Sequence, residues 1–309
     1  MARISKNHDG GEVVVTAGCH IERPTLLRQL AIDTFEAIPS SHAMTAFMEL
    51  DVSAPCARIA ALRAEGVRVS MFAHVVRSIA RALAEHPDLN VVMHGHKIAF
   101  FDDVDVSIPV EAQTASGKYP LQLVIRAAQN KTATEIYAEI EAAKEEQTRS
   151  GDIGVDDRRA RRGMQIARWL PRWLWMFVLR RVIRNARLVK KGAGTTLVTS
   201  VGKFADIPGF VTTFGTGPRG TTFAIGSIVD KPVVRDGEVV VRPVLALTAL
   251  FNHDVVDGGP AARFGARLAE LVEGVDELGS SQAPSTARAN TSRAVHVRVG
   301  GVGSATSVR

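Results

Sequence analysis

One histidine of the chain stands where its side chain could act as a base. His253 directly follows residues 245–251, an uncharged and mostly apolar run typical of a buried strand. An unperturbed imidazole has a pKa of about 6.5, so it can take up a proton near neutral pH. Asp257 follows four residues later, before two glycines and a proline that can open a helix over residues 261–273. Spacing alone favours the simpler interpretation, in which Asp257 merely caps that helix beside a surface histidine.

Four further histidines do not favour a metal site. His74, His86, His94 and His96 fall on different predicted elements and have no recognisable ligand spacing. We therefore interpret them as histidines with structural or solvent-facing roles, and we predict no bound metal.

The elements that must position His253 alternate between helices and strands. Helices are predicted over residues 25–37, 55–64, 134–147 and 261–273, and one further helix is capped by Ser70 and ends before Pro87. Strands are predicted at residues 43–52, 91–93, 97–101, 104–110, 121–125, 195–202, 221–229, 238–241 and 245–251, with turns at 116–118 and 235–238 and an edge strand at 12–16.

The composition is ordinary for a globular chain with a sizeable core, at 309 residues, 46% hydrophobic and 23% charged. Two cysteines, Cys19 and Cys56, are too few for a disulfide framework, and the polar first eleven residues lack the apolar core of a signal peptide. We therefore predict a cytoplasmic protein.

The positive charge is concentrated in one segment. The chain carries a net charge of +6, but residues 158–191 contain twelve Arg or Lys and no Asp or Glu, so the rest of the chain is negative. A basic character confined to one segment argues against a nucleic-acid-binding protein, and it leaves a local acidic partner open.

All three tryptophans lie in this basic segment. Its longest uncharged apolar run, residues 173–179, is too short for a membrane span, which needs about 20 residues. Arginine interleaved with Trp and Phe is typical of a helix in the lipid headgroup layer, so an anionic membrane surface is one hypothesis for residues 158–191. The other, which we favour, is a helical arm that packs on its own or a neighbouring subunit and is kinked at Pro171.

Several motifs, in the same order along the chain, resemble the catalytic domain of dihydrolipoyl acyltransferases, the core enzymes of 2-oxo acid dehydrogenase complexes, and the related chloramphenicol acetyltransferases. They are NHDVVDG at residues 252–258, ALAEHPDLN at 82–90, the strand at 104–110, GTTLVTSVG at 194–202, and IGSIVDKP at 225–232 with Asp236 and Gly237. The resemblance covers roughly residues 34–275. It implies a chloramphenicol acetyltransferase-like α/β sandwich with a large mixed β-sheet and helices packed on one side.

The resemblance also implies a catalytic site. His253 would be the general base, because a thiol with a pKa of about 8.5 is mostly protonated at pH 7 and must lose its proton before it attacks. Thr199 falls on the family's oxyanion-stabilising hydroxyl position, and one such donor contributes up to about 10²–10³ in rate. Asp257 would hold the loop and orient His253, in a salt bridge for which Arg23 and Arg28 are candidate partners.

Three departures from the family pattern affect this site. Ser200 replaces an Asn beside Thr199, and we assign it to substrate or coenzyme A binding. Asn252 and Asp254 replace the Asp and Arg that flank the histidine in the family, which reverses the charge beside the base. Residues 117–120 replace a Gly-Leu pair at the rim of the family's pocket.

We therefore predict a stand-alone, coenzyme A-dependent acyltransferase of this family. It would move an acyl group between a thioester, either acyl-coenzyme A or acyl-dihydrolipoamide on another chain, and a thiol acceptor. Coenzyme A would be a substrate, and no lipoyl group is expected on this chain because residues 1–33 are too short for a lipoyl or subunit-binding domain. The family implies a homotrimer or a higher multiple of trimers, with the base and the oxyanion residue meeting across a subunit boundary.

Two alternatives stay open. One is an O-acetyltransferase that acts on a small hydroxyl compound, and the other is a non-catalytic trimeric scaffold or membrane-associated assembly protein. In either case the protein would be cytoplasmic, or peripheral to a membrane if the lipid hypothesis holds.

The chain divides into three predicted parts. Residues 1–20 form a loosely ordered N-terminal segment, and residues 21–278 form the acyltransferase-like domain with the basic, Trp-rich helical insertion at 156–191. Residues 279–309 have no sustained core pattern, and we predict a disordered tail.

Overall fold

The computed structural model of the chain describes residues 3–6, 12–16, 19–22, 24, 26–114, 117–150, 171–202 and 207–278. The described N-terminal residues form a small antiparallel sheet from β1 (Arg3–Lys6), β2 (Glu12–Thr16) and β3 (Cys19–Glu22). The strand predicted at residues 12–16 is present, but it is the middle strand of this separate sheet and not an edge of the main one. Residues 279–309, for which a disordered tail is predicted, and residues 158–170 of the basic segment lie outside the described residues.

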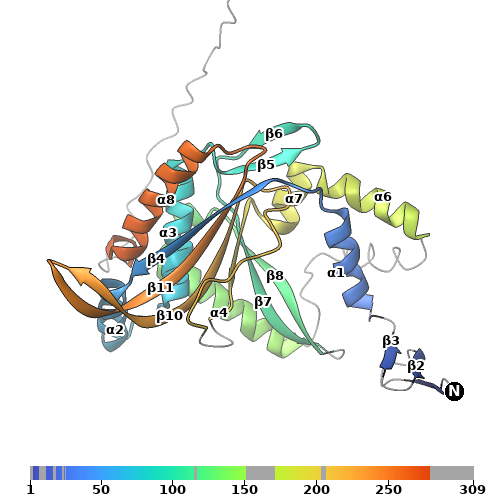
Figure 1. The fold of residues 1–309 in the computed structure, drawn as a ribbon, viewed down its shortest axis with the longest axis horizontal. Coiled ribbons are helices and arrows are strands. Elements are labelled where there is room, and N and C mark those ends of the chain that lie inside the picture. The colour runs from blue at the N-terminus through green and yellow to red at the C-terminus, as the bar shows by residue number, and fades with distance from the viewer. Residues whose placement is uncertain are drawn as a thin grey trace, which may run out of the picture. The chain divides into compact units, whose positions relative to one another are not determined.

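The main sheet has six strands in the order β4-β11-β10-β9-β7-β8 (Figure 1). They are β4 (Ala43–Asp51), β7 (Val106–Thr114), β8 (Gly117–Ile125), β9 (Thr196–Ser200), β10 (Thr221–Arg235) and β11 (Glu238–Asn252). Strand β9 runs parallel to both of its neighbours, and all other pairs are antiparallel, so the sheet is mixed. A separate two-stranded hairpin consists of β5 (Val91–His94) and β6 (Lys97–Phe100).

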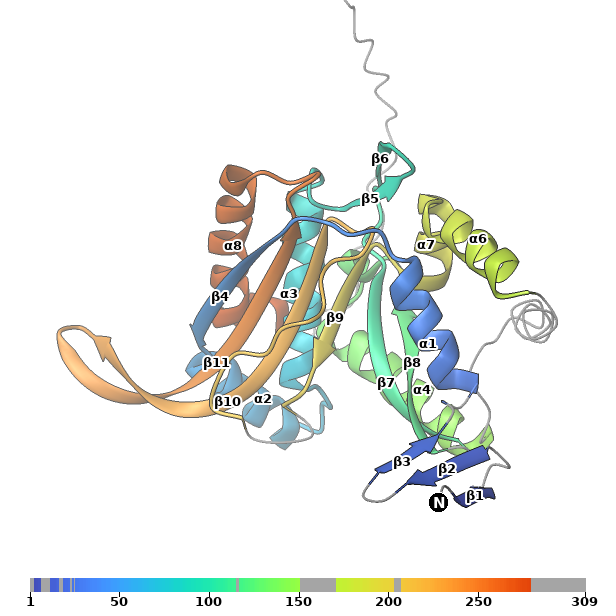
Figure 2. The same ribbon diagram turned by 45° about the vertical axis from the view of Figure 1, so that its right-hand side comes forward.

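Helices α3 (Met71–Glu85), α4 (Ala133–Ser150) and α8 (Gly258–Glu273) pack on one face of the main sheet, with α2 (Ser53–Ala64) beside them (Figures 1 and 2). Two short 3-10 helices, η1 (Ala128–Asn130) and η2 (Asp276–Leu278), lie next to them in the chain. A second group, α1 (Leu26–Ala37), α6 (Arg172–Ile183) and α7 (Ala186–Ala193), lies toward the β7–β8 side, as Figure 2 shows. The predicted sandwich with a large mixed sheet and helices on one side is confirmed.

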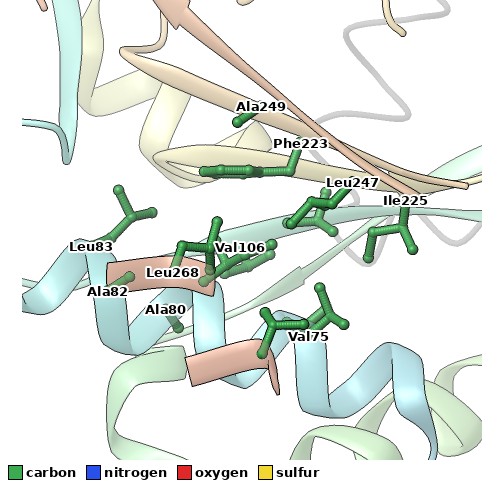
Figure 3. Packing of buried hydrophobic residues seen from close by; sticks show 14 of the residues in the cluster. Val75, Ala80, Ala82, Leu83, Val106, Phe223, Ile225, Leu247, Ala249 and Leu268 are labelled. Carbon is green, nitrogen blue, oxygen red and sulfur yellow. The ribbon is translucent and has the colours of Figure 1, made fainter. Parts of the chain in front are cut away.

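Helix α3 lies at the centre of the core, as its apolar periodicity predicts. Ser70 caps it, since the Ser70 hydroxyl accepts a hydrogen bond from the Ala73 amide at 3.2 Å. Figure 3 shows Val75 and Leu83 of this helix pointing toward Phe223 and Leu247 of the sheet. Each fully buried aliphatic or aromatic side chain of this kind contributes about 1.5–3 kcal/mol, so this interface is a main source of stability.

The long hairpin that ends at His253 is more continuous than the sequence indicates. The strands predicted at 238–241 and 245–251 are one strand, β11, and β10 extends over the whole of its length with one irregularity between Ile225 and Ile228. The predicted turn is correct, because Asp236 and Gly237 both have positive φ angles, of 52° and 84°. The turn predicted at 116–118 is wrong in part, since Gly117 already pairs with Thr114 as the first residue of β8.

The other face of β10 and β11 is crossed by residues 207–220. The Ile207 amide donates to the Ser227 hydroxyl at 3.0 Å, and the ring of Phe210 packs on Phe47 of β4. Gly226 is required here, because a Cβ at this position would lie 3.0 Å from the Gly209 carbonyl oxygen and 3.2 Å from the Ala246 Cβ. This segment therefore covers the strand that leads to His253.

Candidate active site

A buried asparagine builds the turn that carries His253. Asn252 is the last residue of β11 and is 1% exposed. Its amide donates to the Gly220 carbonyl, its own carbonyl accepts from Val255 and Val256, and its side-chain oxygen accepts from the Asp254 amide. Because its side-chain oxygen is hydrogen-bonded to the turn inside the protein, Asn252 fixes the direction in which the chain leaves the sheet.

The His253 side chain lies at the predicted strand end and is 48% exposed. Its amide donates to the His42 carbonyl at 2.6 Å, which anchors its backbone to the residue before β4. Its Nδ1 atom lies 3.9 Å from Asp257 Oδ1, which is beyond hydrogen-bond distance but close enough for an ion pair. The imidazole is therefore accessible, and a carboxylate faces one of its nitrogens.

Asp257 occupies the N-cap position of α8, yet its side chain accepts no capping hydrogen bond. Its carboxylate is 88% exposed and is directed to His253. The helix-cap alternative therefore explains why Asp257 stands before α8, but it does not explain why its carboxylate is directed to His253. Of the two suggested salt-bridge partners, Arg23 lies outside the described residues, and Arg28 is an exposed residue of α1.

Asp254 pairs with a histidine that the sequence does not single out. His42 Nδ1 lies 2.8 Å from Asp254 Oδ1. The two residues are separated by 212 positions and meet because β4 and β11 pair with Ala43 opposite Asn252. The negative charge that Asp254 introduces beside the base thus has a partner.

Thr199 does not meet His253 within one chain. Thr199 is half-buried on β9 and pairs with Ala224, which pairs with Thr248, five residues before His253. Strand geometry therefore separates the two residues by about 17 Å along the sheet and about 10 Å across it. Ser200, the next residue of β9, is half-buried as well and lies no closer in register.

A cavity of about 220 Å³ adjoins the turn that carries His253. Asn252 and Asp254 form one wall of it. The other lining residues come from the segment before β4, the β5–β6 turn, the α6–α7 junction and the loop before β10, and they are Pro39, Ser40, Ser41, Met93, Gly95, His96, Ile183, Arg184, Gly217 and Pro218. A small acceptor, or part of a larger one, could enter beside the base.

Three of the other histidines considered above, His74, His86 and His94, have structural contacts. His74 is fully buried, and its Nε2 atom lies 3.0 Å from the Val272 carbonyl, while His94 Nδ1 accepts a hydrogen bond from the Ala186 amide. Burial lowers the pKa of His74, which keeps that ring neutral. Within the described ranges, no group of three His, Cys, Asp or Glu side chains is arranged to hold a metal ion.

The basic segment packs on its own chain where it is described. Met176 and Ile183 of α6 form a cluster with Ala37 of α1, and Trp175 donates to the buried Asp33 carboxylate at 3.1 Å. Pro171 precedes the first residue of α6, so the kink predicted there is not a break within this helix. Among the described helices, none is long and apolar enough to cross a membrane.

Comparisons with known proteins agree with this fold. Residues 28–161 and 190–279 match the family model of the 2-oxoacid dehydrogenases acyltransferase (catalytic domain). The lipoamide acyltransferase component of the branched-chain alpha-keto acid dehydrogenase complex of Bacillus subtilis (strain 168) is 28% identical over 243 residues, which are 76% of this chain and 47% of that protein. The chain spans about half the length of the curated relatives it matches.

Two solved structures share the fold. Dihydrolipoamide acetyltransferase of Azotobacter vinelandii has a TM-score of 0.61 and 22% identity, covering 84% of this chain and 93% of that one. The cubic core of the pyruvate dehydrogenase multienzyme complex has a TM-score of 0.60 and 21% identity, covering 85% and 96%. With more than half of its residues matching the family model, this chain belongs to the 2-oxoacid dehydrogenase acyltransferase (catalytic domain) family.

Proposed function

We propose that this protein is an acyltransferase that moves an acyl group between a thioester and a thiol, with coenzyme A as one of its substrates. The observation that carries the proposal is the accessible His253 imidazole, fixed at the end of β11 and facing Asp257, in a chain of this family. For the Azotobacter vinelandii enzyme, a histidine and an asparagine four positions later are described with a role in the catalytic mechanism. His253 and Asp257 have the same separation.

In this mechanism, His253 takes the proton of the acceptor thiol. The thiolate attacks the thioester carbonyl carbon, and the tetrahedral intermediate then expels the thiolate of the donor, which receives the proton back from His253. The Asp257 carboxylate stabilises the imidazolium between these two steps and favours the tautomer whose free nitrogen is Nε2.

The hydroxyl of Thr199 would stabilise the negative charge of the intermediate, and Ser200 would contact substrate or coenzyme A. Because Thr199 lies far from His253 in one chain, we propose that the site forms between the His253 of one subunit and the Thr199 of another in a homotrimer or a multiple of trimers. The similarity to the cubic core of a multienzyme complex supports such an assembly. The acyl donor would be acyl-coenzyme A or an acyl-dihydrolipoamide carried by another chain, in a cytoplasm that keeps thiols reduced.

The test is to incubate the protein with acetyl-coenzyme A and dihydrolipoamide and to measure the release of free coenzyme A. We expect turnover, and we expect His253→Ala to lower it by about 10²–10⁴-fold, the usual contribution of a general base. Turnover with small hydroxyl acceptors alone would favour the O-acetyltransferase alternative. A protein that assembles correctly but does not turn over any acceptor would favour the scaffold alternative.

Helix α6 supports a second role, association with an anionic membrane surface. Trp173 and Phe177 on its outer side are 72% and 65% exposed. In the described part of the chain, no carboxylate lies within ion-pair distance of Arg180, Arg181 or Arg184 on the same helix end. Exposed aromatic rings followed by arginines are typical of a helix that lies among lipid headgroups.

A further inference from the structure

The turn after β11 carries two imidazole–carboxylate pairs, His253 with Asp257 and His42 with Asp254. The two side chains of the second pair lie closer together than those of the first. His42 Nδ1 lies 2.8 Å from Asp254 Oδ1, whereas His253 Nδ1 lies 3.9 Å from Asp257 Oδ1. The closer pair joins the residue before β4 to the residue after His253. It is therefore placed to control how the turn sits against the sheet.

His42 makes two contacts with the turn, one with the backbone of the proposed base and one with the residue after it. On one side, the His253 amide donates to the His42 carbonyl and extends the β4–β11 ladder by one rung beyond Ala43 and Asn252. On the other side, the Asp254 carboxylate binds the His42 ring. Beyond these contacts the backbone ladder ends, so the side-chain pair is the last connection between β4 and the turn.

The pair is too exposed to serve mainly as a stabilising ion pair. The side chain of His42 is 90% exposed and that of Asp254 is 37% exposed, and surface pairs of this kind contribute little to the free energy of unfolding. Asp254 also lines the cavity beside His253. A movement of this residue would therefore shift both the base and the wall of the space that a substrate would occupy.

We propose that His42 and Asp254 are positioning residues that hold His253 in its productive orientation. Neither exchanges a proton with the substrate. The inference rests on the proposed acyl transfer. It also explains why a carboxylate is tolerated directly after the base, because the Asp254 carboxylate pairs with the His42 ring and not with His253.

Four variants test the proposal. Asp254→Ala and His42→Ala remove the pair, whereas Asp254→Asn still accepts a hydrogen bond from His42, and His42→Asn places an amide nitrogen near the position of Nδ1. We expect the alanine variants to lower kcat by roughly two- to fivefold with KM little changed, because an exposed ion pair of this kind can bias the orientation of His253 only to that extent. The asparagine variants should retain most of the parent kcat.

The control is Glu49→Ala on β4, the strand that His42 precedes. This variant breaks the surface ion pair between Glu49 and Lys231 of β10 and does not touch the turn. It should retain the parent kcat. Parent-like kcat in both alanine variants, or a loss confined to KM, would overturn the positioning role.

A measurement without substrate separates this inference from the proposed function. The ¹⁵N chemical shifts of the neutral His253 ring report which nitrogen carries the proton, and we expect Nδ1–H, facing Asp257, in the parent and in Glu49→Ala. Asp254→Ala and His42→Ala should give a mixture of tautomers, and an unchanged spectrum would refute positioning even if acyl transfer is found. If the parent does not transfer acyl groups, the proposed function fails while the spectra still decide whether the pair orients His253.

Discussion

At the scale of single residues, the two neighbours of His253 differ in burial and in charge: Asn252 is buried and neutral, and Asp254 is charged and partly exposed. Asn252 replaces a family Asp at a position that is almost completely buried, and a neutral amide avoids the desolvation of a buried carboxylate. Asp254 places its charge at the surface, where His42 pairs with it. The two departures that flank His253 are thus compatible with an accessible, uncrowded base.

A residue-scale prediction concerns His74, the fully buried histidine of α3. Its pKa in the folded protein is lowered by burial, whereas in the unfolded chain it is about 6.5. As the pH falls through 6.5, the unfolded state takes up a proton that the folded state does not, so the free energy of unfolding decreases. Above this pH both states are neutral and the effect is absent.

We therefore expect the parent to lose stability between pH 7 and pH 5 more steeply than His74→Gln, by at most about 1.4 kcal/mol per pH unit. Urea unfolding at a series of pH values measures this difference. Equal pH dependence in the two proteins would show that His74 does not contribute to acid sensitivity.

At the scale of elements, α6 has two different sides. The inner side is held by the Trp175–Asp33 hydrogen bond, by the Arg172–Glu36 ion pair and by Met176 and Ile183. This agrees with the favoured hypothesis of a helical arm on its own subunit. The outer side presents Trp173 and Phe177, which the packing on α1 does not explain.

If the outer side binds lipid, the protein should sediment with vesicles that contain anionic lipid and much less with neutral ones. Replacing Trp173 and Phe177 by Ser should weaken binding about tenfold or more, since each buried aromatic contributes roughly 1.5–3 kcal/mol. Phe100→Ser on β6, which also replaces an exposed aromatic ring without a change of charge, is the matched control and should bind like the parent. Absence of parent binding to anionic vesicles would reject the membrane role.

At the scale of the whole molecule, the order of strands keeps the two proposed catalytic residues apart within one chain. Thr199 is on β9 and His253 follows β11, with β10 between them, and the parallel pairing of β9 and β10 directs Thr199 toward the opposite end of the sheet. A site that uses both residues therefore needs a second copy of the chain.

This arrangement predicts complementation between two inactive variants. His253→Ala and Thr199→Ala should each be inactive or nearly so as homotrimers. Unfolding and reassembling an equimolar mixture should restore about a quarter of the parent activity, because that fraction of subunit boundaries combines one intact His with one intact Thr. Restoration of no activity in correctly assembled mixed trimers would argue against a shared site.

Most elements, and the position of His253 at a strand end, could be predicted from residues that are neighbours in the chain. Apolar periodicity placed α3 and α4 within a few residues, with Ile136 and Ile140 packed inward as predicted, and turn chemistry placed Asp236 and Gly237. His253 at a strand end was readable because a strand and a helix start differ locally in composition. These features depend on residues close together in the chain.

The surroundings of His253, by contrast, could not be predicted without the fold. The contact between His42 and Asp254 depends on the pairing of β4 with β11, and the distance between Thr199 and His253 depends on the order of three strands. The separate N-terminal sheet and the two sides of α6 likewise follow from partners far away in sequence. Local propensity is encoded by neighbours in the chain, whereas the geometry of a site depends on which strands pair, and pairing is decided by the burial of the whole core.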